Sequence, residues 1–353
     1  MLVPATPLSD PLVSVIISNY NYGRYLGEAI RSVLGQTYRK TEIIVVDDGS
    51  TDESHDVISG FKNQIRPLYR DHQGQCAALN AGFAASRGEV LVFFDADDYF
   101  IDDAIERLTK PFRGNKAISK SQGYMIAVDA KGNPLERKIP PLLSPSGNYK
   151  NVILKQGPWA CAQAWTSGNA WARWFIKQAF PLPENVENKA FPDGCLNPLA
   201  ALYGPIVTLT KPVAYYRIHG SNNGPVGTEF SIPSLSMRLT RMRYSHEFVA
   251  KRAASLGLDP PLDRWLKWRG SWRDNLMAYA ISLMDPSRSA PRFHEVVLAP
   301  FASGRTGVLK AAALAVVLTV VWFSPRELAL RMIQRLLRIP APQKLRSSGA
   351  HEH

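Results

Sequence analysis

Cysteine is scarce in this sequence. Only three cysteines occur in 353 residues, at Cys76, Cys161 and Cys195, and there is no C-x-x-C pair or Cys/His cluster. An odd number of widely spaced cysteines argues against a disulfide framework and against a cysteine-based zinc site. A reducing compartment therefore suits the chain best.

Leader and membrane-spanning segments are also lacking. Residues 1–6 contain neither the basic nor the apolar stretch of a signal peptide. The apolar run at 311–323 has 13 residues, whereas a helix needs ~20 to cross a bilayer. We therefore expect neither a signal peptide nor a transmembrane helix, and no internal repeat is visible.

The positive charge is unevenly distributed. Lys and Arg number 23 against 22 Asp and Glu in residues 1–230, but 19 against 8 in residues 231–353, so most of the net charge of +12 lies in the last third. A nucleic-acid enzyme would more often surround its cleft with basic residues, so we expect no nucleic-acid partner. The excess indicates a surface-binding tail or, equally well, a set of solvated Arg-rich helices.

Short apolar runs alternate with helical patterns in the first third of the chain. Strands are predicted near 13–18, 42–47, 65–69 and 90–94, and helices near 25–36, 53–61, 76–86 and 102–112. This alternation predicts βαβ units and an α/β fold with a mostly parallel sheet flanked by helices. Ligands bind at the carboxyl ends of such strands.

Two acidic clusters follow predicted strands. The first, residues 46–52, includes Asp47 and Asp48; it fits a ribose or base contact, but equally a plain Asp-Gly turn with a helix cap. The second contains Asp95, Asp97 and Asp98. Carboxylates at i and i+2 on an extended segment point the same way and can hold a hard cation. Helix capping is the alternative for this cluster.

The sequence around these clusters resembles glycosyltransferase family 2, the large family with the GT-A fold. The similarity covers residues 12–112, with weaker support to about residue 224. The matching blocks, in order, are 13–21, 29–37, 44–52, Gly74 with 80–82, and 88–89 with 94–98. The resemblance implies a Rossmann-like GT-A domain whose halves span 1–115 for the nucleotide-sugar and 116–230 for the acceptor. A basic helical region would follow at 231–353.

The resemblance also implies roles for single residues. Nucleotide binding would fall to Ser18, Asn19, Tyr20, Asp48 and Asp95. Metal binding, of Mn²⁺ or Mg²⁺, would fall to Asp95, Asp97 and His219. Arg217 would add positive charge near the same phosphates. Members of this family generally invert the anomeric centre, which needs a carboxylate base.

The base is expected in the acceptor half. We predict that Asp193 is the base, with Glu184 and Glu187 as alternatives. The alternative role for Asp193 is structural, as the N-cap of the helix that follows it. The family often shows Glu-Asp where this chain has Pro192-Asp193, which leaves the assignment open. The loop Thr166, Ser167, Gly168 and Asn169 resembles the floor of a sugar site.

The predicted function is inverting transfer of a sugar from a nucleotide-diphosphate donor, with UDP favoured, to a glycan or lipid-linked cell-envelope acceptor. The rival hypotheses are a nucleotidyltransferase and a non-catalytic sugar-nucleotide-binding protein. A nucleotidyltransferase would be expected to carry a Gly-rich phosphate loop containing Lys or Arg after the first strand. Here residues 19–24 read Asn-Tyr-Asn-Tyr-Gly-Arg, which argues against that hypothesis. The intact Asp95 and Asp97 pair argues against the second.

The end of the chain predicts a membrane-surface contact. The apolar run 311–323 is followed by Arg326, Arg331, Arg335 and Arg338 with apolar residues between them. This pattern favours binding to anionic lipid. We expect a cytoplasmic enzyme, peripheral on the inner face of the membrane. The alternatives are a buried helix of a C-terminal bundle and a homodimer contact.

Overall fold

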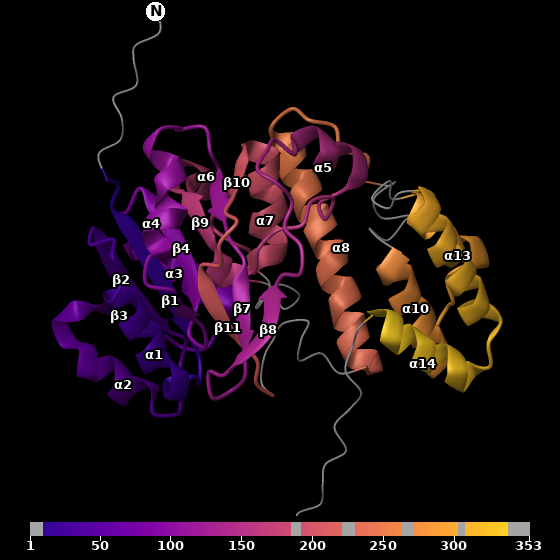
Figure 1. Cartoon of the computed structure of the whole chain (residues 1–353), viewed down its shortest axis with the longest axis horizontal. Helices are drawn as coiled ribbons and strands as arrows, with labels where there is room; N and C mark the ends of the chain where they lie inside the picture. Colours follow the sequence, from indigo (N-terminus) through magenta and orange to yellow (C-terminus); the bar gives the residue numbers. More distant parts are fainter. Residues whose placement is uncertain (1–9, 185–191, 221–229, 263–271, 303–307, 338–353) are drawn as a thin grey trace, which may run out of the picture. The chain divides into compact units, whose positions relative to one another are not determined.

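The computed structural model describes residues 10–184, 192–220, 230–262, 272–302 and 308–337 (Figure 1). The chain divides into two compact units. The first combines Met1–His219 with Arg241–Gly270, and the second combines Gly220–Thr240 with Ser271–His353. Residues 1–115 and residues 116–219 of the two predicted halves therefore share one unit, whereas residues 220–230 are assigned to the second. Residues 241–270, expected in the C-terminal region, belong to the first unit as well.

The first unit is built on a seven-stranded sheet in the order β10-β6-β9-β4-β1-β2-β3. Strands β1 to β4 and the β6–β10 pair are parallel, while β9 runs antiparallel to both β4 and β6. The strands are β1 (Val13–Asn19), β2 (Thr41–Asp47), β3 (Arg66–Tyr69), β4 (Val90–Asp95), β6 (Lys120–Gln122), β9 (Asn169–Ala172) and β10 (Ile206–Thr208). The mostly parallel α/β sheet is confirmed.

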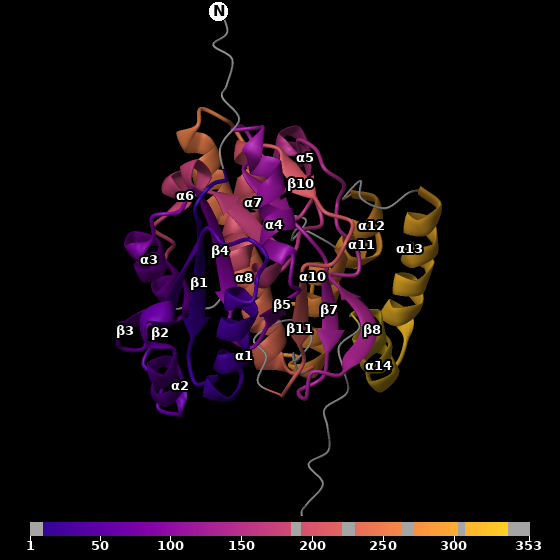
Figure 2. The same cartoon turned by 60° about the vertical axis from the view of Figure 1, so that its left-hand side comes forward.

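Helices flank this sheet (Figure 2). Strands β1 and β4 are almost entirely buried, as their continuous apolar sequence requires when both faces are covered. The flanking elements are α1 (Gly23–Leu34), α2 (Ser54–Phe61), η1 (Lys62–Gln64), α3 (Gln75–Ala85), α4 (Ala104–Thr109), η2 (Lys110–Arg113), α5 (Lys150–Gln156), α6 (Arg173–Ala179) and α7 (Pro192–Tyr203).

Strand register brings the acidic clusters to one edge. Ser18 pairs with Val46 on one side and with Asp95 on the other. Asn19 lies opposite Asp47. The carboxyl ends of β1, β2 and β4 are thus level, as the parallel arrangement predicts.

A second sheet was not foreseen. It has the order β5-β11-β7-β8, made of β5 (Tyr99–Phe100), β11 (Ala214–Arg217), β7 (Met125–Val128) and β8 (Pro134–Ile139). Strand β5 directly follows the second acidic cluster, and β11 directly precedes His219. Their antiparallel pairing brings these two distant segments together.

The C-terminal region is helical. Helix α8 (Ile232–Ser255) contributes residues to both units. The second unit also holds α10 (Trp272–Met284), α11 (Phe293–Val297), α12 (Ala299–Ala302), α13 (Val308–Phe323) and α14 (Arg326–Leu337). Its core includes Tyr279, stacked on Trp322 with ring centroids 4.4 Å apart. Among the residues described, no helix is both long and apolar enough to cross a membrane.

Candidate functional site

Four acidic side chains approach one another at the carboxyl end of β4. Asp95 ends the strand, Asp97 and Asp98 lie in the turn to β5, and Asp193 lies in the first turn of α7. Asp95 interacts electrostatically with both Asp97 and Asp193. The sequence predicted Asp95, Asp97 and Asp193 as site residues, and the fold brings all three together although Asp193 is about a hundred positions away.

The Asp95 carboxyl is held by neutral groups. Gln75 Nε2 donates to its Oδ1 at 2.6 Å, and Thr166 also hydrogen-bonds it. The Asp95 backbone N–H donates to Ser167 Oγ at 3.1 Å. Burial, followed by the negative charges of Asp97 and Asp193, raises the pKa of Asp95 well above its ordinary value. A cation near this group would reverse that effect.

Asp97 and His219 meet in a buried pair. His219 Nε2 lies 2.9 Å from Asp97 Oδ2, and the ring packs 5.4 Å from Tyr22 and 5.2 Å from Tyr25. Tyr22 lies near enough to the cluster that Asp97 and Asp95, after burial, contribute to raising its pKa. His219 thus lies at the acidic cluster, and its predicted contact with a metal stays a prediction.

Arg217 is tied to the acidic turn. Its Nε donates to the Asp97 carbonyl at 3.0 Å, Nη1 donates to the Ala130 carbonyl at 3.2 Å, and Nη2 contacts the Glu28 carboxylate. The side chain is 3% exposed. Its backbone N–H donates to Asp98 Oδ1 at 3.2 Å, so Arg217 fixes the turn that carries Asp97 and Asp98. Its predicted charge near the donor phosphates stays a prediction.

Asp193 is placed and polarised by its surroundings. Thr166 hydrogen-bonds its carboxyl through both side chain and backbone, and Lys120 lies near enough to act electrostatically. Burial outweighs these effects and raises the pKa of Asp193 to about 6. Such a group is ionised at neutral pH and still accepts a proton. Asp193 lies inside the first turn of α7 rather than preceding it.

The alternative bases differ from Asp193 in their surroundings. Glu184 accepts a hydrogen bond from Asn80 Nδ2 at 2.7 Å, on the surface beside α3. Glu187 lies outside the described residues.

Of the side chains predicted to bind the nucleotide, some are buried and support the fold, and others are exposed to solvent. Asn19 is buried, and its Nδ2 donates to Asp47, Ser50 and Ser54 at 2.7, 3.1 and 2.9 Å. Tyr20 is 41% exposed and stacks on His72 with centroids 3.9 Å apart. Ser18 Oγ is 3.4 Å from Gln75 Nε2. The aromatic pair offers an exposed planar surface, whereas the Asn19 side chain supports the turn after β2.

Asp48 is more constrained than its sequence position suggested. Its carboxylate pairs with Arg70 at 3.1 Å and His72 at 2.9 Å, and it accepts the Gly74 N–H at 2.7 Å. Gly74 has a φ of +98°, a conformation that favours glycine. Asp48 therefore anchors the start of α3 and the Tyr20–His72 stack, and its predicted base contact remains a prediction.

The predicted sugar-site loop lies against the acidic cluster. Thr166, Ser167 and Gly168 form the turn η3 (Thr166–Gly168), and the hydroxyl groups of Thr166 and Ser167 meet Asp95 and its backbone. Asn169 is fully buried, and its Nδ2 donates to three backbone carbonyls of the loop. Asn169 thus holds the loop's shape, and its predicted contact with sugar stays a prediction.

Among the described residues, a divalent cation would find only part of a ligand set, because no group of three or more His, Cys, Asp and Glu side chains is arranged to hold a metal ion. Mg²⁺-like ions are, however, commonly bound by one or two carboxylates plus substrate phosphates. The acidic pair Asp95 and Asp97 fits such a site, while His219 is hydrogen-bonded to Asp97.

Several residues around the cluster gave no signal in the sequence. Gln75 binds Asp95, His72 binds Asp48, and Tyr216 is buried beside Asp98, which contributes, after burial, to raising the Tyr216 pKa. Lys120 lies near enough to Asp193 to act on it electrostatically. The only available hint was the position of Gln75 and His72 just before α3, at a strand-to-helix turn.

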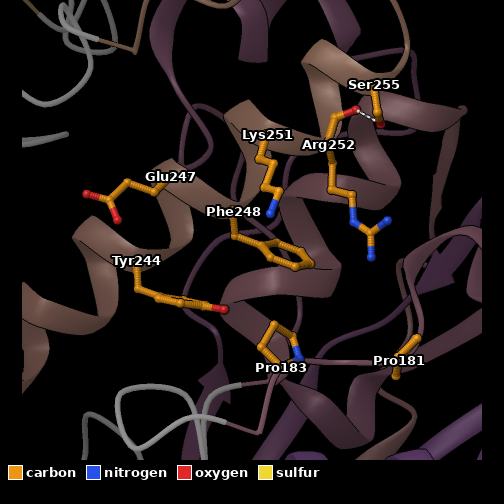
Figure 3. A pocket seen from close by; sticks show the side chains of 8 residues that line it. All are labelled: Pro181, Pro183, Tyr244, Glu247, Phe248, Lys251, Arg252 and Ser255. Atoms are coloured by element: carbon orange, nitrogen blue, oxygen red, sulfur yellow. Dashed lines mark hydrogen bonds between the residues drawn. The ribbon is translucent and has the colours of Figure 1, made fainter.

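A separate pocket of about 550 Å³ lies between α8 and the segment after α6 (Figure 3). Tyr244 and Phe248 stack on one side of it, with Lys251 and Arg252 one turn further along α8. Pro181 and Pro183 line the opposite side. None of the predicted site residues lines this pocket, so it plays no part in the assignment of the acidic cluster.

Comparison with known proteins gives a consistent family match. The model of the family described as "Glycosyl transferase family 2" matches residues 14–166. An uncharacterized glycosyltransferase of Nostoc sp. is 40% identical over 215 residues, which cover 60% of this chain and 66% of the relative. The glycosyltransferase GlyG of Streptococcus pneumoniae is 41% identical over 126 residues, covering 35% of this chain and 42% of GlyG. The chain thus spans less than two thirds of these relatives.

Among solved structures, S. aureus TarS is similar in fold. The match to TarS has a TM-score of 0.54 at 17% identity and covers 92% of this chain and 54% of TarS. The fragment TarS 1–349 gives a TM-score of 0.51 at 17% identity, covering 92% of this chain and 91% of the fragment. At this identity the match supports the fold alone.

Proposed function

This chain belongs to glycosyl transferase family 2, and on that premise we propose that it is an inverting glycosyltransferase. The donor is a nucleotide-diphosphate sugar, with UDP favoured, and the acceptor is a hydroxyl of a glycan or a lipid-linked cell-envelope molecule. The observation that carries the proposal is the shared contact with Thr166, which hydrogen-bonds both the donor-side Asp95 and the acceptor-side Asp193.

Asp193 is the proposed general base. Its carboxylate accepts the proton of the acceptor hydroxyl as the oxygen attacks the anomeric carbon. The new C–O bond forms on the face opposite the departing nucleoside diphosphate, so the configuration inverts. A pKa of about 6 keeps Asp193 ionised at neutral pH and strong enough as a base to take the proton.

Asp95 and Asp97 are the proposed holders of Mn²⁺ or Mg²⁺, with His219 orienting Asp97 or joining the ligand set. The ion, when bound, supplies positive charge to the leaving diphosphate. Gln75 and Thr166 orient the Asp95 carboxyl. Tyr20, stacked on His72, is the proposed contact for the base of the nucleotide, with the Ser18–Tyr20 backbone lining the same pocket.

We also propose that the enzyme is peripheral on the cytoplasmic face of an anionic membrane. Helix α13 exposes a single apolar stripe whose members are spaced three, four or seven residues apart, a spacing that puts them on one helix face. The stripe comprises Leu309 (88% exposed), Val316 (65%), Val320 (52%) and Phe323 (75%). Arg326, Arg331 and Arg335 on the neighbouring α14 are exposed as well.

Exposed apolar side chains beside cations fit a lipid surface, where each basic residue contributes on the order of 1 kcal/mol. A homodimer contact through the same stripe is the competing outcome. Sedimentation with anionic vesicles, set beside the oligomeric state in solution, distinguishes the two.

A screen of nucleotide-sugars by thermal shift, with and without Mn²⁺, tests the donor assignment. A true donor present at a hundred times its Kd stabilises the folded state by about 2.7 kcal/mol. We expect a UDP-sugar to raise the melting temperature only when Mn²⁺ is present. No Mn²⁺-dependent shift with any nucleotide-sugar would contradict the proposal.

A further inference from the structure

Lys120 is a buried lysine that the proposed reaction does not use. It sits on β6 with no exposed surface. Its Nζ donates to Gln163 Oε1 at 3.1 Å and to Asn197 Oδ1 at 2.5 Å, and lies 4.7 Å from the centre of the Trp171 ring. Among the described residues, no carboxylate is within ion-pair distance of this ammonium group. Burying a charge without a direct counter-ion is costly, so packing alone does not explain a lysine here.

The two hydrogen-bond partners of Lys120 belong to the segments that hold Asp193. Asn197 lies four residues after Asp193 on α7, and therefore on the same face of the helix. Its Nδ2 donates to the Ala164 carbonyl at 2.9 Å. Gln163 and Ala164 lead directly into Thr166, which hydrogen-bonds Asp193. One ammonium group thus joins α7 to the loop that orients the proposed base.

The charges of Lys120 and Asp193 also act on each other. Burial lowers the pKa of Lys120 to about 7, while Cys161 and Asp193 act in the opposite direction. The positive charge in turn lowers the pKa of Asp193, against the larger effect of burial. Among the residues that the structure describes, Thr166 and Asp95 also act on Asp193.

We propose that Lys120 is a positioning residue for Asp193. Through its hydrogen bonds to Asn197 and Gln163 it holds α7 against the Gln163–Thr166 loop, and its positive charge helps to keep the proposed base anionic. This inference rests on the proposed function. Lys120 is fully buried and touches no substrate, so it acts only through Asp193. The chemistry of the reaction is otherwise unchanged.

The test measures UDP release, with water as the acceptor, from the UDP-sugar that gives the largest thermal shift. Rates are measured across pH at saturating Mn²⁺. Lys120→Met removes the charge, and we expect the acid limb of the kcat profile to move upward by about one pH unit, with the donor KM changed less than about threefold. Lys116→Met is the matched control, because Lys116 is exposed four residues earlier. It should leave the profile unchanged.

Lys120→Gln covers the case in which Lys120→Met does not fold. Its neutral amide can still hydrogen-bond the Gln163 and Asn197 oxygens that Lys120 contacts at 3.1 and 2.5 Å. The substitution removes the positive charge and adds no charge near Asp193, so the acid limb should again move upward. A purely structural role for Lys120 would change stability and leave the limb in place.

The outcomes separate this inference from the function it rests on. If Asp193→Asn abolishes UDP release but the acid limb of Lys120→Gln stays at the wild-type position, Lys120 does not act on the base and the inference fails alone. If Asp193→Asn releases UDP at the wild-type rate, the base assignment fails first. An upward shift in Lys120→Gln, with Lys116→Met unchanged, supports both.

Discussion

At the carboxyl end of β4, acidic side chains are buried together, whereas on α13 large apolar side chains are exposed to solvent. Asp97 and Asp98 are at most 7% exposed, while Leu309 and Phe323 are at least 75% exposed. Both arrangements oppose the usual distribution of residues, and both have a free-energy cost. Perturbed acids in a site and exposed apolar patches are each typical of places where a partner binds.

The two regions differ in how strongly their geometry is fixed. Each acid of the first region has named hydrogen-bond partners, from Gln75, Thr166, His219 and the Arg217 backbone. The α13 stripe has no such directional contacts, because apolar burial is not directional. A partner at the acidic cluster is therefore recognised by chemistry, and a partner at α13 by surface area and charge.

The largest expected effect is at the metal-binding pair. Asp97→Asn should abolish the Mn²⁺-dependent part of the donor-induced thermal shift, because one of two carboxylate ligands becomes a neutral amide. Asp102→Asn is the matched control, since Asp102 is exposed five residues later. An Asp97→Asn protein that keeps the full Mn²⁺-dependent shift would leave the acidic cluster without its proposed role.

The next effect is the pH dependence of transfer. Burial raises the pKa of Asp193 to about 6, and a general base works only when it is ionised. At saturating substrate, kcat should therefore fall about tenfold for each pH unit below about 6 and level off about one unit above it. A flat kcat profile from pH 5 to 7 would be incompatible with Asp193 as the base.

The smaller effect concerns the α13 stripe. Val316→Glu combined with Val320→Glu should lower partitioning onto anionic vesicles about tenfold or more, since it places two negative charges where apolar contact and cations favour lipid. Leu142→Glu is a control, because Leu142 is 67% exposed in the first unit. High salt should weaken binding of the unaltered chain. If vesicle binding is absent at low salt, the membrane proposal fails and the glycosyltransferase proposal stands.

The sequence predicted the parts of the site that follow from strand alternation. Asp95 and Asp97 were located because a buried apolar strand ends at Asp95, and parallel strands end at a common edge. The family resemblance added Asp193 and His219. The second sheet was missed because β5 and β11 have only two and four residues, too few to show a periodic pattern.

Other parts depended on contacts far apart in the chain. The contact of the Arg217 guanidinium with Glu28 gave no signal because the two residues are 189 positions apart. Lys120 gave no signal because a lysine in a three-residue strand is expected to face solvent. Asn169 looked like a sugar ligand, and only the fold reveals that its amide holds the backbone of its own loop.

Asp193→Asn provides the most direct test of the central claim. Donor binding, measured by the Mn²⁺-dependent thermal shift, should remain, while transfer should fall by roughly two to four orders of magnitude, the usual loss on removing a general base. Glu184→Gln and Glu187→Gln, made in parallel, should keep near-normal rates. Near-normal transfer by Asp193→Asn, with loss in either Glu variant, would contradict the account and move the base to that glutamate.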